Sequence, residues 1–170
     1  MIVIRDILYT IKRFFKRPPD FIVYRDDDSQ YLRRWWVIPR NMYFNIYLHN
    51  FLASDEDRAL HDHPWWNMSL LLTGSYKEHM PLDIDLWKKG NRLTYFKVRR
   101  PFRPVFRGAN AIHRVELFKK NKKEIPVWTL FITGPKKRDW GFWCPKGFVF
   151  WKNFVSEKQG GNGVGKGCGD

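Results

Sequence analysis

Cysteine and long apolar runs are both scarce in this chain of 170 residues. The only two cysteines are Cys144 and Cys168, which excludes a disulfide-rich scaffold and a zinc ribbon built from cysteines. So few cysteines predict the reducing cytoplasm as the compartment. No apolar run approaches the roughly 18 residues of a membrane-spanning helix, so the sequence predicts no transmembrane segment. A signal-peptide pattern is also missing from the N-terminus.

Acidic residues are rare in the second half of the chain. Residues 91–154 hold 16 Lys and Arg against three Asp and Glu, a net charge of +13, whereas residues 1–90 hold 13 against 12, a net charge of +1. A basic region of this size attracts polyanions through counterion release, which would suit non-specific nucleic-acid binding. A solvated surface of lysine-rich hairpin turns explains the same composition, and both interpretations stay open.

Aromatic residues are abundant, at 18% of the chain, with nine Trp and fourteen Phe. Such side chains are typical of strands and ligand pockets. Together with a hydrophobic content of 44%, they predict one folded domain rich in β-strands.

Three parts follow one another along the chain. Residues 1–19 predict an amphipathic helix that ends at Pro18 and Pro19; it would either pack on the domain or lie on an anionic surface. Residues 20–154 read as a β-domain. Residues 155–170 hold six of the twelve glycines and predict a flexible tail.

Short runs of aromatic and β-branched residues, separated by turn residues, predict at least eight strands. Their number and shortness favour an all-β sandwich or barrel. The predicted strands cover residues 21–25, 31–38, 42–48, 60–72, 75–80, 92–98, 111–118, 127–133 and 148–151.

Three of the five histidines form a pattern that is typical of a metal site. His61 and His63 are two residues apart, so on a strand both imidazoles project from one face. His113 lies at the centre of another predicted strand. Neutral imidazoles are ligands for first-row transition metals, and these three predict one such ion: Fe, Mn, Ni or Zn.

The spacing around these histidines resembles the cupin superfamily. His61-Asp62-His63, then Asn67, then Gly74 follow the spacing of the first cupin motif, with Asn67 where the family has an acidic residue. The segment 108–113, which ends in His113, is similar to the second motif. The resemblance covers roughly residues 42–134 and implies a jelly-roll barrel, the double-stranded β-helix, with a metal inside.

More narrowly, four strings look like cupin-like proteins of bacteria and their phages. They are Tyr47-Leu48-His49, His61-Asp62-His63-Pro64-Trp65, Ala111-Ile112-His113-Arg114-Val115 and Trp140-Gly141-Phe142-Trp143. The superfamily's three-histidine members without a carboxylate ligand include thiol dioxygenases, so the resemblance is compatible with oxygen chemistry at iron.

Two residues compete to complete the metal shell. Asn67 offers a neutral amide oxygen that would coordinate the ion or order a water on it. If Thr73-Gly74 is a two-residue hairpin turn, Tyr76 and Glu78 face inward with the histidines. Both are then candidate catalytic residues, with Glu78 as a ligand or a general acid/base. A three-residue turn would bring His79 inward instead.

Further side chains are predicted to shape a substrate site. Trp65 shares the parity of His61 and His63, and Asp62 points away from it. His49 follows a turn and is expected to contact substrate or to support a ligand. Arg138 and Trp140 lie where positive charge alternates with rings, a combination that suits phosphate attraction and base stacking, and equally suits core packing.

The sequence therefore predicts a metal-dependent enzyme that acts on a small anionic molecule, with oxygenase, isomerase and hydrolase chemistry all open. A non-catalytic cupin scaffold that binds nucleic acid or an acidic partner through residues 91–154 is the alternative. A homo-oligomer is compatible with either.

Overall fold

The computed structural model describes residues 16–25, 27–55, 59–156, 163–164 and 167–169. The predicted N-terminal helix lies, over residues 1–15, outside the described residues, so that prediction stays untested. Among the residues described, no helix combines the length and apolar character needed to cross a lipid bilayer.

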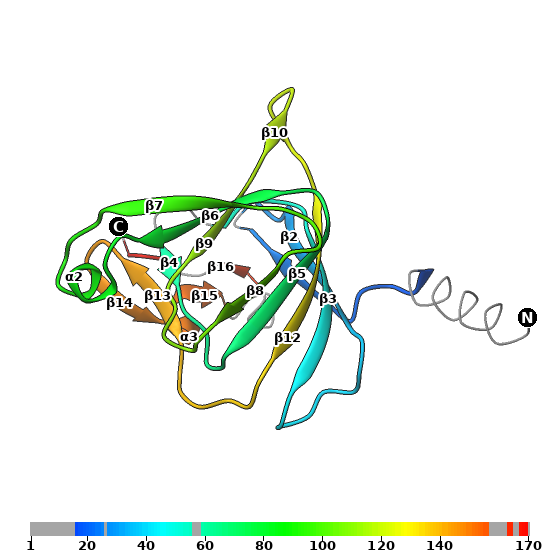
Figure 1. Cartoon of the computed structure of the whole chain (residues 1–170), viewed down its shortest axis with the longest axis horizontal. Helices are drawn as coiled ribbons and strands as arrows, with labels where there is room; N and C mark the ends of the chain where they lie inside the picture. The colour runs from blue at the N-terminus through cyan, green and yellow to red at the C-terminus, as the bar shows by residue number, and fades with distance from the viewer. Residues whose placement is uncertain (1–15, 26, 56–58, 157–162, 165–166, 170) are drawn as a thin grey trace, which may run out of the picture.

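Strands curve around a common interior in two walls (Figure 1). One wall is a six-stranded sheet in the order β1-β2-β3-β12-β5-β8, and its neighbouring strands are antiparallel. Its strands are β1 (Phe21–Tyr24), β2 (Gln30–Trp36), β3 (Asn45–Phe51), β12 (Val127–Thr133), β5 (Asn67–Thr73) and β8 (Pro104–Arg107).

The other wall consists of two three-stranded antiparallel sheets. Their strands are β7 (Thr94–Arg99), β6 (Tyr76–Pro81) and β9 (Arg114–Leu117), and then β14 (Gly147–Phe150), β13 (Gly141–Cys144) and β4 (Leu60–His61). A single bridge joins the two sheets, between His61 at the end of β4 and His113 just before β9. The predicted all-β barrel is therefore confirmed, and two of the three predicted ligands lie at the seam of this wall.

Buried and more exposed residues alternate along β5 and β6, and this alternation shows which side chains face the interior. In β5 the buried residues are Asn67, Ser69 and Leu71, and in β6 Tyr76 and Glu78 are buried while the residues between them are more exposed. Side chains of a strand project alternately to its two faces, so these five share the interior.

The turn between β5 and β6 is not a hairpin turn, and here the prediction was wrong. β5 pairs with β12 and β8, whereas β6 pairs with β7 and β9, so the chain crosses from one wall to the other at Gly74. Gly74 has φ of 72°, and a Cβ there would lie 2.9 Å from Cγ2 of Val127. Only glycine fits this crossing without strain.

Short elements complete the fold. Helix α2 begins after Asp83, whose carboxylate accepts from the backbone N–H groups of Asp85 and Leu86 and so caps the helix. The remaining elements are α2 (Ile84–Lys88), α3 (Trp151–Phe154), the hairpin of β10 (Lys119–Lys120) with β11 (Lys123–Glu124), and the pair of β15 (Val155–Ser156) with β16 (Gly163–Val164).

The core between the walls lies at one end of the interior. Leu71 and Val127 from the six-stranded sheet pack with Tyr76, Val115 and Leu117 from the opposite sheet. Each of these side chains is at most 5% exposed. The apolar residues close this end of the barrel, and the polar interior residues lie beyond them.

Most predicted strands exist, with shifted ends. The long run predicted over residues 60–72 is interrupted, since β4 ends at His61 and β5 begins at Asn67. The strand predicted over 111–118 is only β9, and His113 precedes it in an isolated bridge. The sequence analysis missed β8, β13 and α2.

The C-terminal segment is attached to the barrel wherever it is described. Cys168 forms a disulfide with Cys144 of β13, and β16 pairs with β15. Ala59, Cys144 and Phe154 form a small buried cluster beside this link. The sequence analysis anticipated neither the disulfide nor this attachment, because a sequence with one pair of distant cysteines does not show whether they meet.

Candidate metal centre

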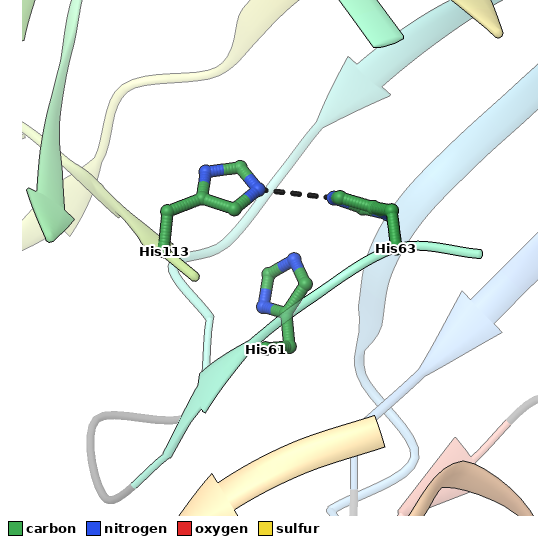
Figure 2. Close-up of side chains that lie close together, drawn as sticks. All are labelled: His61, His63 and His113. Atoms are coloured by element: carbon green, nitrogen blue, oxygen red, sulfur yellow. Dashed lines mark hydrogen bonds between the residues drawn. The ribbon is translucent and has the colours of Figure 1, made fainter. Parts of the chain in front are cut away.

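Three imidazoles converge inside the barrel (Figure 2). His61, His63 and His113 each offer a ring nitrogen, and these nitrogens all lie within 4.8 Å of one another. The Nε2 atoms of His63 and His113 are 3.0 Å apart. The predicted constellation is therefore assembled, although His63 lies just after β4 and not on a strand.

The backbone holds two of these ligands in place. The N–H of His61 donates to the carbonyl of His113 at 2.8 Å, and the N–H of His113 donates to the carbonyl of His61 at 2.9 Å. The ring of His61 also packs near Phe142 of β13, and the ring of His63 lies between Phe131 and Trp140. The three rings are thus positioned by strands and aromatic neighbours.

A carboxylate stands behind two of the three rings. Oε1 of Glu78 lies 2.8 Å from Nδ1 of His113, and Oδ2 of Asp55 lies 3.7 Å from Nδ1 of His61. At 2.8 Å, the Glu78 carboxylate favours the proton on Nδ1 of His113, which leaves the lone pair of Nε2 directed to the common centre. At 3.7 Å, Asp55 is too far from His61 for a hydrogen bond. Asp55 is itself fixed, since it accepts hydrogen bonds from Tyr31 and from the backbone N–H of Val115.

The electrostatic surroundings keep His63 and His113 neutral. Burial lowers the pKa of His63 well below its usual value, and the neighbouring His61, His113 and Arg107 lower it further. Burial also lowers the pKa of His113, to about 4, with Arg107 acting in the same direction and Glu78 against it. A neutral imidazole is the form that binds a metal.

These residues fit a divalent transition metal. Two nitrogens at about 2.1 Å from one ion and at right angles to each other are about 3 Å apart, which is the separation of the His63 and His113 Nε2 atoms. A hydrogen bond between the two rings gives the same distance, provided that His63 carries its proton on Nε2. The carboxylate behind His113 favours the metal, because a proton held on Nδ1 directs the Nε2 lone pair to the common centre.

Glu78 faces the interior as predicted, but its carboxylate is already engaged. It accepts from Nε of Arg107 and from Nε of Arg99, each at 2.5 Å, besides its contact with His113. Burial would raise the pKa of Glu78, but the hydrogen bonds and charges of His113 and Arg107 hold it well below its usual value. Glu78 therefore lies behind a ligand, and His79 points away, where it contacts Glu116.

Asn67 and Tyr76 lie next to this network. Asn67 is fully buried, and its Oδ1 accepts from Nη1 of Arg107 at 3.4 Å. Tyr76 is buried beside Ser69 and Arg107, and burial raises the pKa of its phenol. The prediction that Asn67 ligates the metal and the prediction that Tyr76 acts in catalysis remain predictions.

His49 lies on the opposite wall. Its Nε2 accepts from Nε of Arg34 at 2.8 Å, and its ring stacks on Tyr47 and Phe131. Burial, with help from the Arg34 charge, lowers the pKa of His49 well below its usual value. Phe131 contacts both His49 and His63, so His49 supports the wall next to the triad.

The two predicted substrate residues near the C-terminus both contact other parts of the chain, and their role at a substrate stays a prediction. Arg138 donates from Nη2 to Asp62 at 2.9 Å and from Nη1 to the carbonyl of Ala109 at 2.8 Å. Trp140 stacks between His63 and Trp151.

Trp65 and Asp62 occupy neighbouring positions with different surroundings. The indole Nε1 of Trp65 is buried and has no hydrogen-bond partner among the residues described. Asp62 points away from the triad, as predicted, and accepts from Gly141 and Trp143.

Sequence reasoning missed several residues around the triad. Arg107 contacts Glu78, Ser69 and Asn67, and Arg34 contacts His49. Arg107 immediately precedes the glycine of the second motif, which was the one local signal available. Without a predicted strand over residues 104–107, nothing in the sequence oriented that side chain.

Comparisons with known proteins bear on the fold. No protein-family model and no curated protein sequence matches the chain. Among solved structures, FeII HppE in complex with substrate is similar at 13% identity with a TM-score of 0.51, over 71% of this chain and 57% of that chain. The match therefore spans little more than half of HppE.

Two weaker structural matches cover more of the partner chain. A cupin domain of an XRE-family transcriptional regulator from Enterobacter cloacae matches at 10% identity and a TM-score of 0.41, over 62% of this chain and 97% of that one. A conserved protein with a double-stranded β-helix domain from Klebsiella pneumoniae subsp. pneumoniae matches at 11% identity and a TM-score of 0.46, over 74% and 88%. The chain has a double-stranded β-helix fold.

Proposed function

We propose that this protein is a metal-dependent enzyme that binds one divalent transition metal through His61, His63 and His113 and acts on a small anionic molecule. The observation that carries the proposal is the convergence of three ring nitrogens within 4.8 Å, with carboxylates behind two of the rings. A structural histidine cluster has no need of oriented lone pairs, whereas a metal site does.

The charge of the surroundings supports an anionic substrate. Imidazoles bind a metal in their uncharged form, so three of them would leave the double charge of the ion uncompensated. Arg107 and Arg34 both lie close enough to His63 to lower its pKa. The nearest buried carboxylate, Glu78, is already neutralised by Arg99 and Arg107. The interior next to the triad is therefore electropositive and favours an incoming anion.

The chain's own residues define how such a site would work. His61, His63 and His113 hold the ion, which supplies Lewis-acid polarisation of a bound oxygen or, if it is iron, oxygen chemistry. Glu78 would keep the Nδ1 proton of His113 in place. Trp140 and Phe131 flank His63 and restrict water around it.

Metal content tests the proposal. Untagged protein purified without chelator is analysed for iron, manganese, nickel and zinc beside the double variant His61→Ala/His113→Ala. His79→Ala is the matched control, since His79 lies on β6 but contacts Glu116 on the outer face. We expect about one ion per chain in the wild type and the control, and none in the double variant.

The identity of the ion then selects the activity screen. If the ion is iron, oxygen consumption is measured with small acids as substrates. If it is zinc or manganese, hydrolysis and isomerisation are assayed. If the wild type contains no metal and takes up none on reconstitution, the proposal is wrong.

Nucleic-acid binding is a second candidate, favoured by exposed side chains of β7, of β8 and of the segment between them. β7 is exposed along most of its length, and Phe96, Phe102 and Phe106 are 52%, 75% and 72% exposed. Lys97 and Arg103 lie among them, also exposed. Exposed rings with interspersed cations suit base stacking and phosphate contact.

Salt dependence tests this second candidate. A single-stranded oligonucleotide is titrated against the wild type and against Lys97→Gln/Arg103→Gln, with anisotropy as the readout. Binding that weakens in the variant, with a shallower dependence on salt, supports the candidate. Equal binding by both proteins contradicts it.

A further inference from the structure

Asn67 lies in the barrel interior between Thr133 and Arg107. It is the first residue of β5, and its neighbours across the sheet are Thr133 of β12 on one side and Arg107 of β8 on the other. Residues opposite each other in antiparallel strands project from the same face. Asn67 and Thr133 are both fully buried, and Arg107 is 9% exposed.

Arg107 fixes which way the amide of Asn67 points. The guanidinium can only donate, so the oxygen of the amide faces Nη1 of Arg107, at 3.4 Å. A flipped amide would place two donors against each other. The oxygen is thereby engaged by a cation, and the Nδ2 group, a donor, is the part of the side chain left for another partner.

That donor has no acceptor in the part of the chain that the structure describes. Nδ2 of Asn67 is buried without a hydrogen-bond partner, and so is Oγ1 of its neighbour Thr133. Leaving a buried donor unpaired is costly. The nearby carboxylate of Glu78 cannot serve, because Arg99, Arg107 and His113 already occupy it.

The two donors lie beside the histidine triad. Arg107 connects Asn67 to Glu78, which contacts His113. Phe131 precedes Thr133 by two residues on the same face of β12, and its ring lies 5.8 Å from that of His63. Arg107 also lies close enough to His63 to lower its pKa. A molecule that extends from the triad toward the ends of β5 and β12 would have Asn67, Thr133 and Arg107 along one side.

We infer that Asn67 and Thr133 donate hydrogen bonds to the oxyanion of a small organic carboxylate held beside the triad, and that Asn67 is not a metal ligand. Arg107 supplies the positive charge that attracts the carboxylate. A carboxylate suits the site because its oxygens carry several lone pairs in one plane and accept from two neighbouring donors at once. The inference rests on the proposed function for the position of the ligand, and it adds the substrate class.

Calorimetric titration with pyruvate tests the inference. The titration is carried out on the metal-free and on the cobalt(II)-loaded full-length protein. The variants are Asn67→Leu and Thr133→Val. Asn50→Leu is the matched control, because Asn50 also has a buried Nδ2 without a hydrogen-bond partner among the residues described. Asn50 follows His49 in β3, so its side chain projects from the face of the strand opposite to that of His49. Cobalt affinity is measured separately by competition with a chelator.

We expect pyruvate affinity to fall about tenfold or more in Asn67→Leu and Thr133→Val and to stay unchanged in Asn50→Leu. Cobalt affinity should change less than about threefold in all three. If Asn67→Leu does not fold, Asn67→Asp replaces it: its carboxylate would repel pyruvate and give the same loss.

Three outcomes overturn the inference. Weaker cobalt binding in Asn67→Leu with unchanged pyruvate binding would make Asn67 a metal ligand. Binding of inorganic phosphate in place of pyruvate would make the substrate class wrong. If neither the metal-free nor the cobalt-loaded wild type binds pyruvate, the proposed carboxylate site does not exist.

If cobalt does not bind at all, the proposed function is wrong. The inference is then tested on the metal-free protein alone, by the same comparison of pyruvate affinity among the variants.

Discussion

His61 and His113 exchange two backbone hydrogen bonds, of 2.8 and 2.9 Å, and the same two residues present their rings to a common centre. Among the residues described, this is the one isolated β-bridge, and it joins the two three-stranded sheets of one wall. The position of these two candidate ligands is therefore set by the fold of the barrel.

Removing the carboxylate behind His113 should weaken metal binding. In Glu78→Gln the amide holds the Nδ1 proton of His113 less firmly, and we expect metal affinity to fall about 10- to 100-fold. Chelator competition with cobalt(II) measures it.

The control for this variant is Glu116→Gln, which removes a carboxylate from the outer face, where it contacts His79 and Lys77. Its metal affinity should equal that of the wild type. Equal affinities in all three proteins would show that Glu78 does not support His113.

Asp62 should matter for stability. Its carboxylate is 1% exposed and accepts from Arg138, Gly141 and Trp143. Asp62→Asn removes the charge that balances Arg138 and places a donor where three donors converge, so we expect a loss of about 2–4 kcal/mol in the free energy of unfolding.

Urea unfolding measures this loss, with Asp139→Asn as the control. Asp139 forms an exposed ion pair with Lys136, and its neutralisation should leave stability unchanged. A result in which both variants unfold like the wild type would contradict the role given to Asp62.

The disulfide should stabilise the attachment of the C-terminal segment. Cys144 and Cys168 are 24 residues apart in sequence, and closing a loop of that length stabilises a chain by about 3–4 kcal/mol. Cys144→Ser/Cys168→Ser should lower the free energy of unfolding by this amount, and reductant should have no further effect on the variant.

Thiol titration of the native wild type provides the independent check. We expect no reactive thiol before reduction and two per chain after it, since the chain has two cysteines. Two thiols in the unreduced native protein would mean that the disulfide is not formed in solution.

Gly141 should tolerate no side chain. A Cβ at this position would lie 2.2 Å from the carbonyl oxygen of Val149 on the paired strand, so Gly141→Ala must push β13 and β14 apart. We expect a loss of about 1–3 kcal/mol in stability by thermal or urea unfolding. Gly108→Ala is the control, because nothing lies within 4 Å of a Cβ there; similar losses in both variants would contradict this explanation.

The sequence predicted the barrel and the triad because both depend on local patterns. Alternation marked the interior face of β5, and the spacing of His61, His63 and His113 matched a known motif. The inward position of Glu78 was also predicted, but from a hairpin between β5 and β6 that does not exist, since the two strands belong to different walls.

The sequence did not predict which residues the charged side chains contact. Glu78 was expected at the metal, and it contacts Arg99, Arg107 and His113 instead. Arg138 was expected at the substrate, and it contacts Asp62, 76 positions away in the chain. Such pairings depend on how the walls close, and local periodicity carries no information about them.

The number of imidazoles on a bound metal tests the central claim most directly. X-ray absorption spectroscopy of the zinc-loaded full-length protein resolves imidazole nitrogens at about 2.0–2.1 Å through their ring scattering. The account predicts three imidazoles per ion in the wild type and fewer in His113→Ala. A shell of oxygens alone in the wild type, or the same number of imidazoles in both proteins, would contradict it.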